Sequence, residues 1–531
     1  MKRVNLRKEQ APLYEALYEY KNSGQFSFHV PGHKKGKAYA AHGGAGFLEE
    51  AMGADVTEIS GTDDLHHPEG VIRDAQQLAA DCFGAEESFF LVGGSTSGNL
   101  AMILTVCAQP GDLLLVQRNV HKSVLNGLML AGASAVFLQP EMDAGSGLMT
   151  APAAETVAAA LAAYPDAKGV LVTMPNYYGM GNDLAPLAEA CHRHDVPLMV
   201  DEAHGAHYGQ HPQLPRSALA SGADVIVQST HKMLAALTMG AMLHVQGPRV
   251  DRGLLRQRLA MVQSSSPSYP VMGSLDLARR LLHVQGADLF TAGLAAVEGL
   301  KRGLAELPRF GLLQPQARQQ GAAAGYDAAA YTAQDPFKVV IYDRTEVLSG
   351  YELQRRLEAR GCVPEMSDDR YVVLLYSLGS TEEDTRHLLD ALTHISVEKA
   401  DAQQLAVQPR DAFTAPGLSS ANSDKGKEAS VEFSTWNNSF SEPVPFTLRP
   451  IHSDEVEAIP LSKSAGRTAA EMIIPYPPGI PLLYPGEGIT ETAAIRLQGL
   501  AHAGAKCQGA QDPRLGTILV YKKNSRKQGN E

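Results

Sequence analysis

Two reactive side chains follow two apolar segments of this 531-residue chain. Asp201 ends the run Pro197-Leu-Met-Val-Asp201, and Lys232 ends the run Val225-Ile-Val-Gln-Ser-Thr-His-Lys232, 31 positions later (232 − 201). Open α/β sheets bind ligands beyond the carboxyl ends of their strands, so the carboxylate and the amine are expected to face one pocket. A desolvated lysine can form a Schiff base with an aldehyde, and a carboxylate can keep a pyridine nitrogen protonated. The pair therefore predicts a site for pyridoxal 5′-phosphate.

Each of these residues also has a structural interpretation. Lys232 could lie on the surface, although the apolar strand before it and Met233-Leu-Ala-Ala-Leu237 after it favour burial. Asp201 could be the N-cap of a helix that follows its strand. Glu202 is the weaker partner for a cofactor, since adjacent strand residues point to opposite sides.

A glycine-rich segment, Gly93-Gly-Ser-Thr-Ser-Gly-Asn99, lies between a strand-like run and a helix-like segment from Leu100 to Ala108. Backbone N–H groups at a helix N-terminus bind phosphate, and the hydroxyl groups of Ser95, Thr96 and Ser97 can add to them. An ordinary Ser/Thr N-cap is the alternative, but the company of Asp201 and Lys232 favours a phosphate site.

Three histidines and a serine complete the predicted site. His121 could stack over a pyridine ring, and His204 could pack on the other face of that ring. Ser229 and His231 flank Lys232 and could contact the phosphate or donate a proton. Any of these side chains could instead be a satisfied structural group. His66-His67 stands beside two aspartates, but the following Pro68 favours a loop over a metal site.

The elements that position these residues alternate along the chain. Seven short apolar runs are separated by helix-like segments, which predicts a mostly parallel sheet covered by helices on both faces. The runs are 88–92, 113–117, 135–138, 169–173, 197–200, 225–229 and 241–244. The predicted domains are an N-terminal arm (1–45), a large cofactor-binding domain (46–300), a small α+β domain (301–400), a flexible linker (401–445) and a compact C-terminal module (446–531).

Composition narrows the class of protein. The net charge is 46 − 58 = −12 with no long basic run, which disfavours a nucleic-acid surface and is compatible with a cationic small substrate. The five cysteines are scattered and form no metal-ligand pattern. No signal peptide or membrane span is evident, so we expect a cytoplasmic protein without a membrane partner.

Several motifs together resemble the ornithine/lysine/arginine decarboxylases, which are fold-type I pyridoxal-phosphate enzymes. They are Phe28-His-Val-Pro-Gly-His-Lys34, Gly61-Thr-Asp-Asp-Leu-His-His-Pro68, Asp201-Glu-Ala-His-Gly205, Ser229-Thr-His-Lys232, Gln263-Ser-Ser-Ser-Pro-Ser-Tyr269, Pro475-Tyr-Pro-Pro-Gly-Ile-Pro481 and Pro485-Gly-Glu487. Because Pro31-Gly-His-Lys34 begins so early, the chain looks like the short biosynthetic type without a wing domain.

The resemblance implies roles for individual residues. Lys232 would be the Schiff-base lysine, Asp201 the partner of the ring nitrogen, and His121 the stacking residue. Ser95, Thr96, Ser229 and His231 would surround the phosphate, and Ser265 would complete the phosphate site of a neighbouring subunit. A homodimer or larger homo-oligomer, with the active site at the subunit interface, would then be the active form.

The resemblance also implies a reaction: decarboxylation of a basic L-amino acid, with Lys232 or His231 returning the proton to Cα. Arginine, which would give agmatine for polyamine synthesis, is the preferred substrate. Lysine and ornithine are the nearest alternatives, and an aminotransferase or aldolase on the same fold is a more distant one. The acidic candidates for binding the distal cationic group are Asp63, Asp64 and Glu365.

Overall fold

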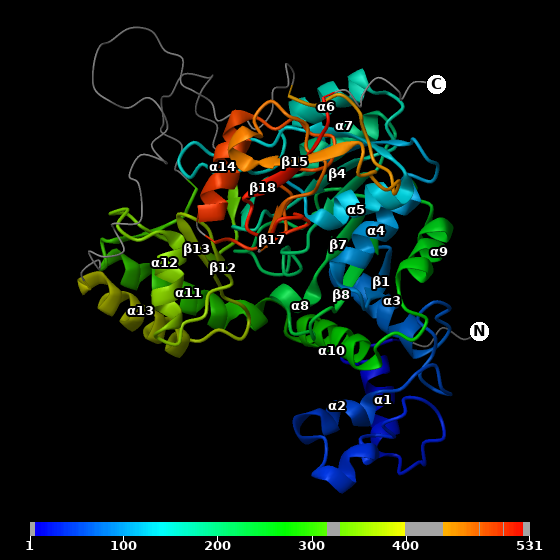
Figure 1. Cartoon of the computed structure of the whole chain (residues 1–531). Helices are drawn as coiled ribbons and strands as arrows, with labels where there is room; N and C mark the ends of the chain where they lie inside the picture. Colours follow the sequence, from blue (N-terminus) through cyan, green and yellow to red (C-terminus); the bar gives the residue numbers. More distant parts are fainter. Residues whose placement is uncertain (1–5, 316–329, 399–438, 477, 503, 524–531) are drawn as a thin grey trace, which may run out of the picture.

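The computed structural model describes residues 6–315, 330–398, 439–476, 478–502 and 504–523, and a large sheet forms its centre (Figure 1). The sheet has eight strands in the order β1-β8-β7-β6-β4-β2-β3-β14. These strands are β1 (Glu87–Leu91), β2 (Leu113–Gln117), β3 (Ser134–Leu138), β4 (Val170–Thr173), β6 (Leu198–Asp201), β7 (Val225–Gln228), β8 (Ala241–Val245) and β14 (Val444–Pro445).

The directions of the strands confirm the prediction of a mostly parallel sheet. Strands β3, β2, β4, β6 and β7 are joined by parallel pairings. Strand β8 is antiparallel to both β7 and β1, so β1 runs in the same direction as the other five. All seven predicted strands are present, and their carboxyl ends, except that of β8, lie at one edge.

The eighth strand, β14, was not predicted. It pairs two residues, Val444 and Pro445, with the edge strand β3. Two residues are too few to show a strand period, and the proline is compatible only with an edge position. This strand belongs to 439–445, the last part of the predicted linker, which the structure places along the sheet. The rest of that predicted linker, 401–438, lies outside the described residues.

Helices cover both faces of the sheet, which explains why its strands are apolar throughout. Alternate strand residues enter two different cores: Val170 and Val172 pack into one, and Leu171 packs into the other. The first core contains side chains of α3 (Val71–Phe83), α6 (Ala154–Ala163), α7 (Ala185–Arg193) and α10 (Tyr269–Gln285). The second contains side chains of α4 (Gly94–Val106), α5 (Lys122–Ala131) and α9 (Arg252–Val262).

The N-terminal segment is attached to helix α10. Figure 1 shows α1 (Pro12–Asn22) and α2 (Glu49–Ala54), in blue, beside this helix. The backbone N–H of Leu13 donates to the buried carboxylate of Asp276, at 2.9 Å. The fully buried Arg279 pairs with Asp276 and donates to the carbonyls of Lys8 and Gln10. These contacts fasten the start of the chain to the large domain.

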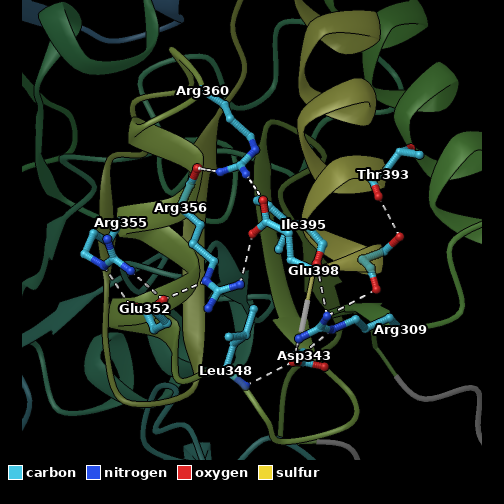
Figure 2. A network of polar contacts seen from close by, with 11 residues as sticks. Arg309, Asp343, Leu348, Glu352, Arg355, Arg356, Arg360, Thr393, Ile395 and Glu398 are labelled. Carbon is cyan, nitrogen blue, oxygen red and sulfur yellow. Dashed lines mark hydrogen bonds and ion pairs between the residues drawn. The ribbon is translucent and has the colours of Figure 1, made fainter. Parts of the chain in front are cut away.

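The small domain contains a four-stranded antiparallel sheet in the order β12-β13-β11-β9. Its elements are α11 (Thr291–Ala305), β9 (Phe310–Leu312), β11 (Lys338–Asp343), α12 (Gly350–Glu358), β12 (Met366–Ser367), β13 (Tyr371–Leu375) and α13 (Glu382–Val397). The apolar runs 337–342 and 371–376 largely form its two long strands, β11 and β13. Figure 2 shows the ion pairs that join these elements, with Arg309 on Asp343 and Arg356 on Glu352 and Glu398.

The C-terminal module has its own core. The strands β15 (Val456–Pro460) and β18 (Thr517–Tyr521) pair antiparallel, and α14 (Glu491–His502) packs with them through Leu497. A second short pair joins β16 (Ile474–Pro475) to β17 (Cys507–Gln508). Residues 478–487 of this module reach the edge of the large sheet, where Arg118 donates to the carbonyls of Pro481 and Leu482 and forms an ion pair with Glu487 at 2.7 Å.

Within the described parts of the chain, every helix is too short or too polar to traverse a lipid bilayer. All five cysteines are free thiols.

Candidate active site

Asp201 and Lys232 lie at neighbouring strand ends. Asp201 is the last residue of β6, and Lys232 lies in the one-turn helix α8 (Thr230–Met233) that follows β7. The two strands pair directly, with Asp201 opposite Val227. Burial lowers the pKa of the Lys232 amine, while the charge of Asp201 acts on the same amine in the opposite direction. The carboxylate and the amine therefore share one site, as the sequence predicts.

The amine of Lys232 is surrounded by rings. Its Nζ atom lies 3.0 Å from Nε2 of His204 and 5.5 Å from the centroid of the Tyr177 ring. The rings of Tyr177 and His204 are themselves in contact, with 4.3 Å between centroids. Because burial disfavours the charged form, the pKa of this amine is lowered and more of it is in the uncharged, nucleophilic form.

A chain of hydrogen bonds runs from Asp201 to His121. The amide Nδ2 of Asn99 donates to Oδ2 of Asp201 at 2.8 Å and to Oγ of Ser123 at 2.9 Å. Ser123 Oγ in turn donates to Nδ1 of His121 at 2.8 Å. The other oxygen of Asp201 accepts the backbone N–H of Ala203. Asn99 and Ser123 were not predicted as site residues, although Asn99 ends the glycine-rich motif and Ser123 follows His121 by two positions.

His121 is held in one tautomer and is covered by the C-terminal module. It is the N-cap of α5, and its Nδ1 accepts hydrogen bonds from the N–H and the hydroxyl of Ser123, so Nε2 carries the proton. Gly479 packs against this ring, since a Cβ on Gly479 would lie 3.0 Å from Nε2 of His121. Burial lowers the pKa of His121, which favours an uncharged, planar imidazole ring.

The N-terminus of α4 lies beside Ser229, which precedes Lys232 by three positions. Gly93 and Gly94 open this helix without a side-chain cap, and Gly94 has a positive φ of +70° that favours glycine. Ser229 donates to Ser95 across the gap between β7 and α4, at 3.0 Å. Thr96 is exposed on the same turn, whereas the hydroxyl of Ser97 donates to the carbonyl of Gly94. Ser95, Thr96 and Ser229 can therefore surround a phosphate, and Ser97 supports the turn.

The remaining predicted residues take different positions. His231 donates from Nδ1 to the carbonyl of Gly240 at 2.9 Å, and burial lowers its pKa, so a role as proton donor requires a prior protonation. His204 lies between Lys232 and a second lysine, Lys338, which was not predicted. Ser265 is exposed in the loop between α9 and α10. His66 and His67 lie in turns between α2 and α3, which confirms the loop.

Glu202 points away from this site, as expected because adjacent residues of a strand point to opposite sides. Its carboxylate accepts hydrogen bonds from the amide of Gln228 at 2.7 Å and the N–H of Ala218 at 2.8 Å. Burial raises the pKa of Glu202 to about 8. Glu202 is therefore part of the buried interior on the other side of the sheet, away from Lys232.

The donor set fits pyridoxal phosphate. An acid, an amine, a neutral imidazole and a glycine-rich helix N-terminus with two hydroxyls lie at adjoining strand ends. Among the described residues, the buried atoms Asn99 Oδ1 and Thr173 Oγ1 have no hydrogen-bond partner. Thr173 stands opposite Asp201 in the β4–β6 pairing. Both atoms are therefore available to hydrogen-bond a polar ligand at this edge of the sheet.

Comparisons with known proteins show the family of this chain. The family described as "Orn/Lys/Arg decarboxylase, major domain" matches residues 11–384, and the C-terminal domain of the same family matches residues 446–509. The chain is 38% identical to the uncharacterized protein YaaO of Bacillus subtilis, over 96% of this chain and 98% of that protein. It is 33% identical to the arginine decarboxylase of Halalkalibacterium halodurans, over 98% and 99% of the two chains.

Among solved structures, the lysine decarboxylase LdcF of Francisella novicida has the same fold. The TM-score is 0.74 at 21% identity, and the match covers 96% of this chain and 81% of the other. Both domains of the family are therefore present in this chain, in order. The chain belongs to the Orn/Lys/Arg decarboxylase family.

Proposed function

We propose that this protein is a pyridoxal-phosphate-dependent decarboxylase that converts arginine to agmatine and CO2. The observation that supports this most directly is the pairing of Asp201 and Lys232 at adjacent strand ends, with a lysine amine that burial makes less basic. When bound, pyridoxal phosphate supplies an electron sink for the electron pair that the departing CO2 leaves on Cα.

The residues of this chain would divide the work of holding the cofactor. Lys232 carries the aldehyde end, and Asp201 keeps the ring nitrogen charged. Asn99 orients Asp201, and His121 covers one face of the ring while the Gly479 loop presses on it. Ser95, Thr96, Ser229 and the first turn of α4 hold the phosphate. Lys232 is the favoured donor of the proton to Cα, since Nδ1 of His231 is bonded to Gly240.

Glu365 is the proposed partner of the distal guanidinium group. Asp63 accepts backbone N–H groups from Glu69, Gly70 and Ile72, and Asp64 accepts one from His66, so both carboxylates are occupied by the chain. Glu365 is exposed, and its charge acts on the pKa of Lys232, Lys338 and His231. A carboxylate at this position can receive the far end of a substrate whose α-amine is near Lys232.

The active form would be a homodimer or a larger homo-oligomer. Ser265 lies on an exposed loop, where it could complete the phosphate site of a second copy. The large side chains of Phe26, Phe28 and Phe47 are exposed in the N-terminal segment, which is compatible with an interface there. Sedimentation of the purified protein, with Ser265→Ala assayed for cofactor affinity, tests this assembly.

The decisive experiment measures CO2 release from arginine, lysine and ornithine by the purified protein with added cofactor. We expect the highest kcat/KM for arginine, with agmatine as the product. A preference for lysine or ornithine would correct the substrate, and a keto acid or aldehyde product would indicate an aminotransferase or aldolase.

A substitution tests the substrate contact. Glu365→Gln should raise the KM for arginine by about tenfold with little change in kcat, because it removes a charge that binds ground state and transition state alike. Glu358→Gln, an exposed carboxylate on α12, is the matched control. An unchanged KM in Glu365→Gln would exclude this residue as the partner of the guanidinium.

A further inference from the structure

A second buried lysine reaches the active site from the small domain. Lys338 is the first residue of β11 and is 2% exposed. Its Nζ atom lies 2.9 Å from Nδ1 of His204, and Nε2 of the same ring lies 3.0 Å from Nζ of Lys232. One imidazole therefore bridges two amines that come from different domains.

The imidazole of His204 limits which of the two lysine amines can be charged. Burial, together with the charges of the two lysines, lowers the pKa of His204 well below its usual value, so the ring is neutral. A neutral imidazole has one N–H and one lone pair. If both contacts are hydrogen bonds, one amine donates to the ring and the other accepts from it. An ammonium group has no lone pair, so the accepting lysine must be uncharged.

Groups on both domains face this bridge. The ring of Tyr177 lies 5.5 Å from the Lys232 amine and 5.6 Å from the Lys338 amine. On the large-domain side, the titratable groups are Asp201, His121 and His231. On the small-domain side, Asp335 and Glu365 act on Lys338.

The pKa of Lys338 lies close to neutral pH. Burial lowers its pKa to about 8, against the opposing influence of Asp335 and Glu365. Asp335 itself is fixed, because the fully buried His207 bonds to it at 3.1 Å. Lys338 can therefore exist in either form near neutral pH.

The backbone is shaped to admit this lysine. Gly179 has a φ of +81°, and a Cβ on it would lie 2.5 Å from Cβ and 2.8 Å from Cγ of Lys338. The side chain of Gln334 donates to the carbonyls of both Tyr178 and Lys338, which ties the two segments together. Lys338 is thus held in place at the domain junction by close packing.

We propose that Lys338 is a positioning residue for Lys232: as an ammonium group it donates to Nδ1 of His204, and the Nε2–H of that ring then holds Lys232 as a free amine. This inference rests on the proposed attachment of pyridoxal phosphate to Lys232. In that attachment the free amine forms a C=N bond with the aldehyde carbon, and its two hydrogens leave with the aldehyde oxygen as water. A charged Lys232 cannot begin this reaction.

The test measures attachment and not turnover. The full-length protein, stripped of cofactor, is mixed with pyridoxal phosphate over a range of pH, treated with borohydride, and the modified fraction of the Lys232 peptide is measured by mass spectrometry. Lys338→Met should move the midpoint of attachment upward by about one pH unit, which is roughly tenfold slower attachment at neutral pH. Lys338→Arg, which stays charged, should restore the wild-type profile. Lys301→Met, on the surface of α11, should leave it unchanged.

The possible results separate the two proposals. Wild-type protein that is not modified at Lys232 would overturn the proposed function and this inference together. Modification at Lys232 with the same midpoint in Lys338→Met would overturn the inference alone. Should Lys338→Met fail to fold, His204→Phe removes the bridge from the large-domain side, and the same upward shift is required of it.

Discussion

Two regions of the molecule bury charged side chains, and they differ in how those charges are compensated. In the small domain (Figure 2), Arg309 pairs with Asp343 at 2.9 Å, and Arg356 contacts Glu352 at 2.6 Å and Glu398 at 3.0 Å. In the active site, the amines of Lys232 and Lys338 instead face a neutral imidazole. The first region joins opposite charges, and the second places two amines on one neutral ring.

The ionisation of the two regions follows from this difference. Burial acts to raise the pKa of Asp343, but hydrogen bonds from Arg309, Thr345 and Leu348 outweigh it and hold that pKa below its usual value. In the active site, burial lowers the pKa of both lysines. Paired charges therefore keep their ordinary forms and stabilise the fold, whereas the weakly compensated amines favour the uncharged form that reacts with aldehydes.

The largest effect is expected from Lys232→Ala. Loss of the amine should reduce decarboxylation by roughly ten-thousandfold or more and abolish covalent attachment of the cofactor, with little change in thermal stability. Activity assays, borohydride trapping and thermal unfolding measure the three quantities. Lys301→Ala on α11 is the control, and substantial turnover by Lys232→Ala would contradict the assignment.

Asp201→Asn should lower kcat by about a hundredfold to a thousandfold, because the variant lacks the carboxylate charge that keeps the ring nitrogen of the cofactor protonated. Glu202→Gln provides the matched control. Its carboxyl is the next along the chain but lies among Ala218 and Gln228, so its activity should stay within about threefold of wild type. Equal losses in the two variants would remove the distinction between the two carboxyls.

Arg309→Met should affect stability and leave the active site intact. It leaves the buried carboxylate of Asp343 without its ion pair and frees the carbonyls of Ile395 and Ser396 at the end of α13. Breaking such a pair is expected to lower the free energy of unfolding by about 3 kcal/mol, as measured by urea denaturation. The KM for arginine should not change, and a large change in it would show that the two regions are coupled.

The same pair predicts a dependence on pH. Because the pKa of folded Asp343 lies below its value in the unfolded chain, its contribution to stability is present above about pH 4 and is lost as the pH falls through the folded pKa. The difference in thermal midpoint between wild type and Arg309→Met should therefore narrow below about pH 4. A constant difference down to pH 3 would mean that the charge of Asp343 is not the source of the effect.

The sequence determined the elements and half of the site. Continuous apolar runs between helix-like segments predict strands that are buried on both faces, and all seven such runs are strands. The ends of β6 and β7 place Asp201 and Lys232 together, because neighbouring parallel strands end at the same edge. The glycine-rich turn at the start of α4 is predicted in the same way, because it lies between a strand-like run and a helix-like segment.

Only the tertiary structure decided the other half. Lys338 is separated from Lys232 by 106 positions (338 − 232) and belongs to another domain, so no local period connects it to the site. Its local signal is a lysine at the start of an apolar strand, whereas Lys232 follows the end of one, and β11 lies in a different sheet. Likewise, Asn99 and Gly479 gain their roles from contacts with Asp201 and His121. Local sequence sets the period and the ends of strands, whereas packing between domains decides which distant side chains meet.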